Sequence, residues 1–154
     1  MDEDVKTIIL SSSHRDYGTE ADCYFNVGAS NLLDQTKKYL CKVKWIHFAI
    51  PNTVIPYDPK RTMWMTINGL TLVDTYYKTN NFPFLAIDCD LWSSACDKAF
   101  LYEPSDCLRK VIPSQHIWNV KLFHADTNWV LMDPWTVDTT QNRDWTMELQ
   151  FIEI

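Results

Sequence analysis

A strict alternation of apolar and polar residues in one late segment constrains the fold of this chain more than any other feature. The apolar members are Trp145, Met147, Leu149 and Phe151, and the polar members are Thr146, Glu148 and Gln150. Successive side chains of a β-strand point to opposite faces, so this spacing predicts a strand with one buried face. Ile152 and Ile154 then fall on the polar side, which predicts either a bulge or an apolar outer face there.

Shorter runs of β-forming residues precede this strand, separated by Pro, Asn, Asp and Gly. They cover residues 6–11, 23–27, 39–50, 63–67, 70–77, 84–89, 117–123 and 129–132. No long stretch has apolar residues at helical spacing, and the segment 92–108 is interpreted as irregular, with one helical turn or a short helix as an alternative. About eight strands at this spacing predict an all-β chain, a single jelly-roll-like antiparallel β-sandwich. The length of 154 residues fits one domain, residues 1–154.

Two local signals predict how particular strands are arranged. Asn68-Gly69 stands between two β-like runs, and this pair is the strongest short-range signal for a hairpin turn. The run 39–50 carries lysines and stops at Pro51-Asn52, where proline removes a backbone donor. We therefore expect a hairpin at Asn68-Gly69 and a strand at or near a sheet edge over 39–50.

The acidic balance of the chain limits its direct partners. The formal net charge is −6 and the isoelectric point is near 5.0, which disfavours direct binding to nucleic acid or anionic lipid.

The first residues are acidic and lead into a short apolar run, unlike a signal peptide, and no segment approaches the ~20 apolar residues of a membrane span. We expect synthesis in a reducing cytoplasm without a signal peptide. The five cysteines are then expected to be buried thiols, without a disulfide framework.

Residues that could carry chemistry are present but do not form a known motif. Cys89, Cys96 and Cys107 are too far apart for a zinc knuckle. The four histidines lie outside any nucleophile motif, and three glycines are too few for a phosphate loop. The sequence therefore predicts no catalytic residue, metal site or cofactor, and no enzyme. An enzyme with a dispersed Cys-His site is kept as an alternative.

Seven tryptophans are the most unusual feature of the composition. Most are expected to fill the core, because several fall on apolar faces of predicted strands. Four aromatic residues beside polar turn segments are candidates for an interface: Trp129, Trp135, Tyr76 and Tyr77. Exposed Trp and Tyr on a β-sandwich also suit a carbohydrate-binding module, the alternative function.

Several polar segments are interpreted as structural turns. In the segment 13–16, Asp16 is expected to accept backbone hydrogen bonds and Arg15 to bridge to a carboxylate. Pro51 and Asn52 are interpreted as a rigid strand terminator, and Asn68 and Gly69 as a turn.

The order of these signals resembles one family. The matching segments are Ser11-Ser12-Ser13-His14-Arg15-Asp16, Gly18-Thr19, Cys23-Tyr24-Phe25-Asn26-Val27, Ala49-Ile50-Pro51-Asn52-Thr53 and Asp144-Trp145-Thr146-Met147-Glu148-Leu149-Gln150-Phe151. They resemble the minor capsid and penton-type single jelly-roll proteins of tailless icosahedral double-stranded DNA viruses, including giant-virus, virophage and Polinton-like relatives. The middle of the chain is unmatched.

The resemblance implies a structural virion protein without a cofactor or a reaction. Such a subunit assembles with itself, with a pentamer as the suggested form, and with a major capsid protein. It implies a location in the capsid. The chain length leaves little room for the insertion domain that larger penton proteins carry.

Overall fold

The structure is a computed structural model that describes most of the chain. The described residues are 4–19, 22–48, 62–73, 84–88, 100–104, 108–124 and 144–154. Within them the chain forms eleven strands, two short 3-10 turns and no α-helix. The elements are β1 (Val5–Ser11), η1 (Ser12–His14), β2 (Tyr17–Thr19), β3 (Asp22–Asn26), η2 (Val27–Ser30), β4 (Tyr39–Phe48), β5 (Thr62–Asn68), β6 (Leu70–Leu72), β7 (Leu85–Asp88), β8 (Phe100–Tyr102), β9 (Leu108–Pro113), β10 (Ile117–His124) and β11 (Trp145–Glu153).

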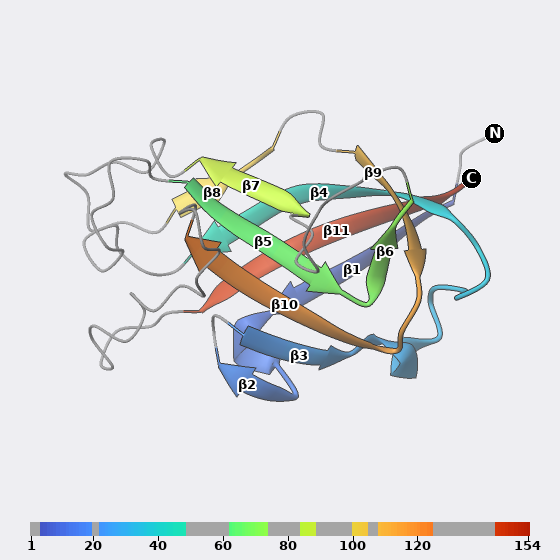
Figure 1. Cartoon of the computed structure of the whole chain (residues 1–154), viewed down its shortest axis with the longest axis horizontal. Helices are drawn as coiled ribbons and strands as arrows, with labels where there is room; N and C mark the ends of the chain where they lie inside the picture. The colour runs from blue at the N-terminus through green and yellow to red at the C-terminus, as the bar shows by residue number, and fades with distance from the viewer. Residues whose placement is uncertain are drawn as a thin grey trace.

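The strands form two antiparallel sheets that pack as a sandwich, so the predicted all-β sandwich is confirmed. The six-stranded sheet has the order β1-β11-β4-β9-β6, with β8 also paired to β4. The five-stranded sheet has the order β2-β3-β10-β5-β7. Figure 1 looks onto the five-stranded sheet, with β1, β11 and β4 in the layer behind it.

Eight of these strands are paired in a nested order. The first pairs with the last, the second with the seventh, the third with the sixth and the fourth with the fifth. These pairs are β1·β11, β3·β10, β4·β9 and β5·β7. One long antiparallel hairpin rolled into two sheets has this pairing, which is the jelly-roll topology. The other three strands, β2, β6 and β8, add three residues each at the sheet margins.

The core lies between the two sheets and is held by aromatic contacts from one sheet to the other. Trp118 of β10 lies 5.9 Å from Phe151 of β11, and Phe25 of β3 lies 6.1 Å from Trp145, between ring centroids. Trp118 and Trp145 are both about 1% exposed, as expected for core-filling tryptophans. Alternation in β10 and β11 therefore supplies large rings to one shared interior.

The end of β11 decides between the two alternatives for Ile152. Its pairing with β1 and β4 continues without a shift, and Ile152 lies opposite Val5 on one side and Leu40 on the other. The bulge against β4 lies earlier, between Glu148 and Leu149. Ile152 is therefore part of an apolar row on the outer face of the sheet.

Two expectations about strand arrangement were wrong. The Asn68-Gly69 turn does not form a hairpin, because β5 pairs with β10 and β7, whereas β6 pairs with β9 in the other sheet. Gly69, with φ +117°, turns the chain across the edge of the sandwich. The strand β4 is not an edge strand either, because it lies between β11 and β9. Lys42 and Lys44 are exposed on its outer face, so they mark a solvent-facing side of an interior strand.

Candidate functional site

A polar turn after β1 is anchored to the start of β11. Ser12 is fully buried, and its Oγ donates a hydrogen bond to Asp144 Oδ1 at 2.8 Å and accepts one from the Trp145 N–H at 2.9 Å. Arg15 donates to the carbonyl oxygens of Ser12 and Gly18 at 2.7 and 2.9 Å. Its Nη1 also lies 4.0 Å from Asp144 Oδ1. The turn therefore joins two segments that are far apart in the sequence.

Asp16 links the same turn to β3. Its Oδ2 accepts a hydrogen bond from the Asn26 N–H at 2.6 Å, and its own N–H donates to the Tyr24 carbonyl oxygen at 2.8 Å. The groups of Arg15 and Asp16 are thus engaged in bonds within the chain, which is a structural role for both residues.

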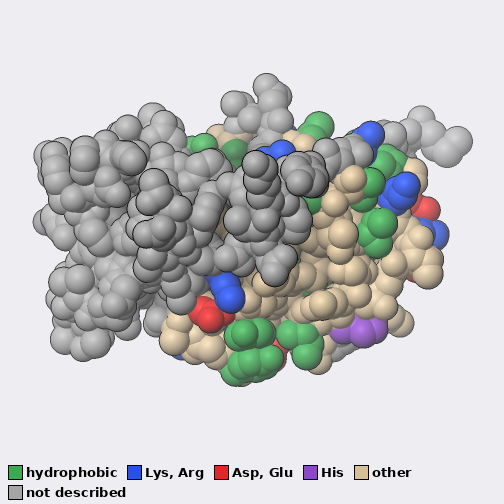
Figure 2. Space-filling model, viewed as in Figure 1, with side chains coloured by type: hydrophobic (Ala, Val, Ile, Leu, Met, Phe, Trp, Pro, Cys, Tyr) green, Lys and Arg blue, Asp and Glu red, His purple; other side chains and the backbone are tan. Residues whose placement is uncertain are grey.

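A polar groove lies on the outer face of the five-stranded sheet, beside the turn at Gly69. It has a volume of about 570 Å³, in the range of small-molecule sites. The residues that line it are Tyr24, Asn68, Gly69, Leu70, Thr71, Leu72, Ser114, Gln115, Asn119 and Lys121. Figure 2 looks onto this face, where polar surface covers the described middle and an apolar patch lies over β2 and β3.

An aromatic stack borders this groove. The rings of Tyr17 and Tyr24 are stacked, with centroids 4.3 Å apart and planes 11° from parallel. Tyr17 is 54% exposed, so one side of the stack faces solvent. Asn119, next in the same cross-strand row, donates from Nδ2 to Asp22 Oδ1 at 2.6 Å. The groove is therefore lined by Tyr24 and Asn119, and each of them is fixed by a neighbour outside the lining, the Tyr17 ring and the Asp22 carboxylate.

The outer face of the six-stranded sheet carries apolar side chains among polar ones. Val5, Ile9, Leu101 and Leu108 are each about half exposed. Trp45 is half-buried on this face, opposite Glu148, and Glu148 lies opposite Ile9 on its other side. Such a mixed surface, with large apolar groups between charged ones, is typical of protein contact surfaces.

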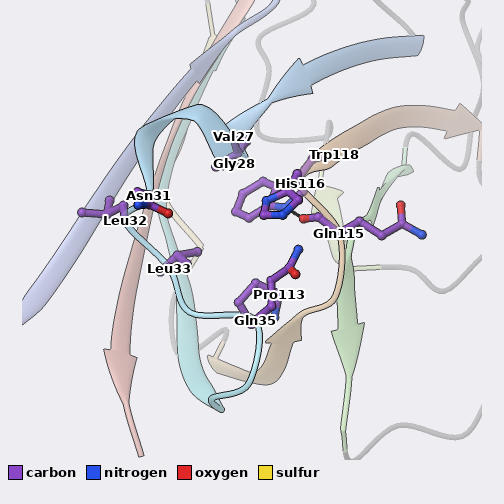
Figure 3. A pocket seen from close by; sticks show the side chains of 10 residues that line it. All are labelled: Val27, Gly28, Asn31, Leu32, Leu33, Gln35, Pro113, Gln115, His116 and Trp118. Carbon is purple, nitrogen blue, oxygen red and sulfur yellow. Dashed lines mark hydrogen bonds between the residues drawn. The ribbon is translucent and has the colours of Figure 1, made fainter.

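A small cavity lies between the loop after η2 and the turn that joins β9 to β10 (Figure 3). His116 closes one side of it, and its carbonyl oxygen accepts hydrogen bonds from the N–H groups of Val27 and Gly28 at 2.9 and 3.0 Å. The cavity holds about 20 Å³, enough for one water molecule and far too little for an organic ligand. It is therefore a packing feature.

The cysteines and the groups with shifted pKa values in the described part of the chain do not gather in one site. Cys23 and Cys41 are fully buried thiols in the apolar core, as expected for these two cysteines, and no three His, Cys, Asp or Glu side chains of the described residues gather as metal ligands. Hydrogen bonds from Thr36 hold the pKa of Asp34 below its usual range. A hydrogen bond with Glu153 raises the pKa of Lys37. Both shifts belong to exposed turn residues.

Six of the residues singled out from the sequence lie outside the described residues. They are the interface candidates Trp129, Trp135, Tyr76 and Tyr77 and the strand terminators Pro51 and Asn52. The sequence reasoning did not select Val5, Ile9, Tyr17 or Tyr24. For Ile9 a signal existed, because the unbroken apolar run Ile8-Ile9-Leu10 must place an apolar side chain on the outer face.

Comparisons with protein-family models, with curated proteins and with solved structures find no match to this chain. Among the described residues, no helix has the length and apolar character to cross a membrane.

Proposed function

We propose that this chain is a non-catalytic structural subunit of an icosahedral virus shell, of the minor capsid or penton type. The observation that carries the proposal is the nested pairing of eight strands, β1·β11, β3·β10, β4·β9 and β5·β7. Jelly rolls with this pairing are a recurrent building block of viral capsids. Because one fold serves many functions, surface features must add to this argument.

The resemblance to capsid proteins gains support from the contacts of Ser12. The matched segments that end β1 and begin β11 touch through its hydrogen bonds to Asp144 and Trp145. Two of the matched segments therefore form one continuous corner of the fold, although they are distant in sequence.

The surface favours protein partners. The net charge of −6 opposes direct contact with packaged nucleic acid. The outer face of the six-stranded sheet offers Val5, Ile9, Leu101 and Leu108 at about half exposure. We propose that such faces bind further copies, as a pentamer in the form that the resemblance implies, and a major shell protein in the virion.

The proposal is tested on particles. Virus particles are purified through a density gradient, washed with high salt and analysed by targeted mass spectrometry for peptides of this chain. We expect a fixed copy number relative to the major shell protein, and density at the vertices or between capsomers in electron cryomicroscopy. Loss of the chain from washed particles, with the shell intact, would count against a structural role.

A second function is favoured by the Tyr17 and Tyr24 stack beside the polar groove. Lectin domains also use jelly rolls, and sugars bind to flat aromatic rings flanked by amide and carboxylate groups. Binding on a glycan array that Tyr17→Ala abolishes would support this function. The same array with Trp129→Ala and Trp135→Ala tests the aromatic residues that the sequence singled out.

A further inference from the structure

The strand β1 is the longest edge strand of the described sandwich. It spans seven residues and lies at the end of the six-stranded sheet, with β11 as its neighbour in the described part. The other margins in that part are β2, β6 and β8, with three residues each, and β7, with four. A long edge strand presents a row of unpaired backbone groups that can pair with another strand.

Natural edge strands are usually protected by proline, a bulge or a charged side chain, and of these β1 has one charged side chain, Lys6. Its pairing with β11 runs without a shift from Val5 to Ser11. Its one charged side chain, Lys6, is half-buried: Nζ donates to the Leu32 carbonyl oxygen at 2.9 Å and lies 5.9 Å from the Tyr39 ring centre. The half-buried Lys6 ammonium is therefore engaged by groups of its own chain, on the side of β1 that faces the other sheet.

The outward side chains of β1 are apolar or small. Val5 is 49% exposed and Ile9 is 59% exposed, with the exposed Thr7 between them. The other flank is also accessible, because a groove of about 320 Å³ runs beside Thr7, Ile8 and Leu10. A second strand can thus reach β1 from the side.

The sequence of β1 is complementary to itself in an antiparallel register centred on Thr7. If two copies pair with Thr7 opposite Thr7, then Val5 of each copy lies opposite Ile9 of the other. Cross-strand pairs of β-branched residues and of threonines are favourable. A register centred on Lys6 would instead place two ammonium groups opposite each other, and one centred on Ile8 would place Val5 opposite Ser11. The register centred on Thr7 covers the exposed apolar side chains of both copies.

We propose that β1 pairs with β1 of a second copy about a two-fold axis at Thr7, which joins two six-stranded sheets into one. This contact closes on itself as a dimer, because the same surface is used on both sides. It goes beyond the proposed function, since it is a property of the chain in solution. A five-fold ring would use other margins of the sandwich.

The test uses the purified full chain and variants at Thr7. The wild-type protein is expected at twice the monomer mass of 18.1 kDa in sedimentation and native mass spectrometry. Thr7→Lys and Thr7→Glu each place like charges opposite at the axis and should weaken the dimer by about tenfold or more. A mixture of the two variants should restore a dimer that contains one copy of each. Thr71→Lys, an exposed position on β6, is the matched control and should remain dimeric.

Three results would overturn the pairing. They are a wild-type chain that stays monomeric at high concentration, a Thr7→Lys dimer of unchanged strength, and a mixture that forms no mixed dimer. Amide hydrogen exchange of the wild-type chain provides a measurement that needs no variant. The amides of residues 5–11 should exchange more slowly at high concentration than after dilution, and equal rates would contradict the proposal. These outcomes do not depend on whether particles contain the chain.

Discussion

Ser12 and Asp144 are hydrogen-bonded at 2.8 Å although 132 residues separate them in the sequence. Ser12 is fully buried and also accepts a hydrogen bond from the Trp145 N–H. One hydroxyl thus fixes the turn after β1 to the start of β11, and removing it would take one hydrogen bond from the half-buried Asp144 carboxylate and one from the buried Trp145 N–H.

We expect Ser12→Ala to lower the free energy of unfolding by about 1 to 3 kcal/mol, the cost of leaving buried polar groups unpaired. Urea denaturation followed by tryptophan fluorescence measures this change. Ser13→Ala is the matched control, because Ser13 is exposed and its hydroxyl contacts Ser11 at the surface. Equal stability of the two variants would contradict the role of Ser12.

Gly69→Ala should destabilise the fold by about 2 to 4 kcal/mol, from backbone strain at positive φ and from overpacking. Gly69 has φ +117°, and an added Cβ would overlap the ring of Trp118. Asn68→Ala, at the exposed neighbouring position, should cost much less. Thermal unfolding of both variants gives the comparison, and a Gly69→Ala variant as stable as Asn68→Ala would contradict this account.

Thr66→Val should raise the free energy of unfolding by about 1 kcal/mol, since removal of an unsatisfied buried hydroxyl relieves its desolvation cost. Thr66 is 1% exposed, and its Oγ1 has no hydrogen-bond partner among the residues that the structure describes. Thr71→Val is the control, because the Thr71 hydroxyl is exposed and donates to Ser114 at 2.8 Å. Chemical denaturation that finds Thr66→Val less stable than the wild type would indicate a partner for this hydroxyl.

The pKa of Asp34 should lie below 3.8 in the folded chain, because its carboxylate accepts hydrogen bonds from the Thr36 hydroxyl and N–H at 2.6 and 2.8 Å. A lowered folded pKa means that this carboxylate stabilises the fold above pH 3.8 and loses the effect as the pH falls through the folded value. An NMR titration measures the pKa. Thr36→Val removes the hydroxyl and should move the pKa of Asp34 upward, and an unchanged value would contradict the stated cause.

Cys23 and Cys41 should react slowly with a thiol reagent in the native chain and rapidly in denaturant, because both are fully buried. Peptide mapping by mass spectrometry after timed alkylation assigns the label to each cysteine. Fast labelling of either cysteine in the native chain would contradict this prediction and would favour the alternative of an enzyme with a reactive thiol.

The sequence predicted the strands whose alternation is complete but not the partners of each strand. Alternation identified β11 and β10 within a few residues of their bounds. By contrast, β9 was missed because two cations and a proline interrupt its apolar pattern. One of those cations, Arg109, is accommodated by a hydrogen bond to the Phe84 carbonyl oxygen at 3.3 Å, a contact that no local pattern contains.

The candidate surfaces were less predictable because they depend on contacts between strands that are distant in the sequence. A local turn at Arg15 and Asp16 could be inferred from residue types, but its attachment to Asp144 depends on the pairing of distant strands. The stack of Tyr17 on Tyr24 likewise requires the register of β2 on β3. Side-chain periodicity identifies the face of a residue, whereas tertiary pairing decides its neighbours.

The pairing of β1 with β11 also bears on how the polypeptide matures. The strand β1 leaves the ribosome well before β11 and cannot pair with it until β11 has been translated. Until then its backbone has no native ladder to join, and topologies dominated by such distant pairings fold slowly. Nascent chains of this protein are therefore expected to depend on chaperones that shield the early strands during synthesis.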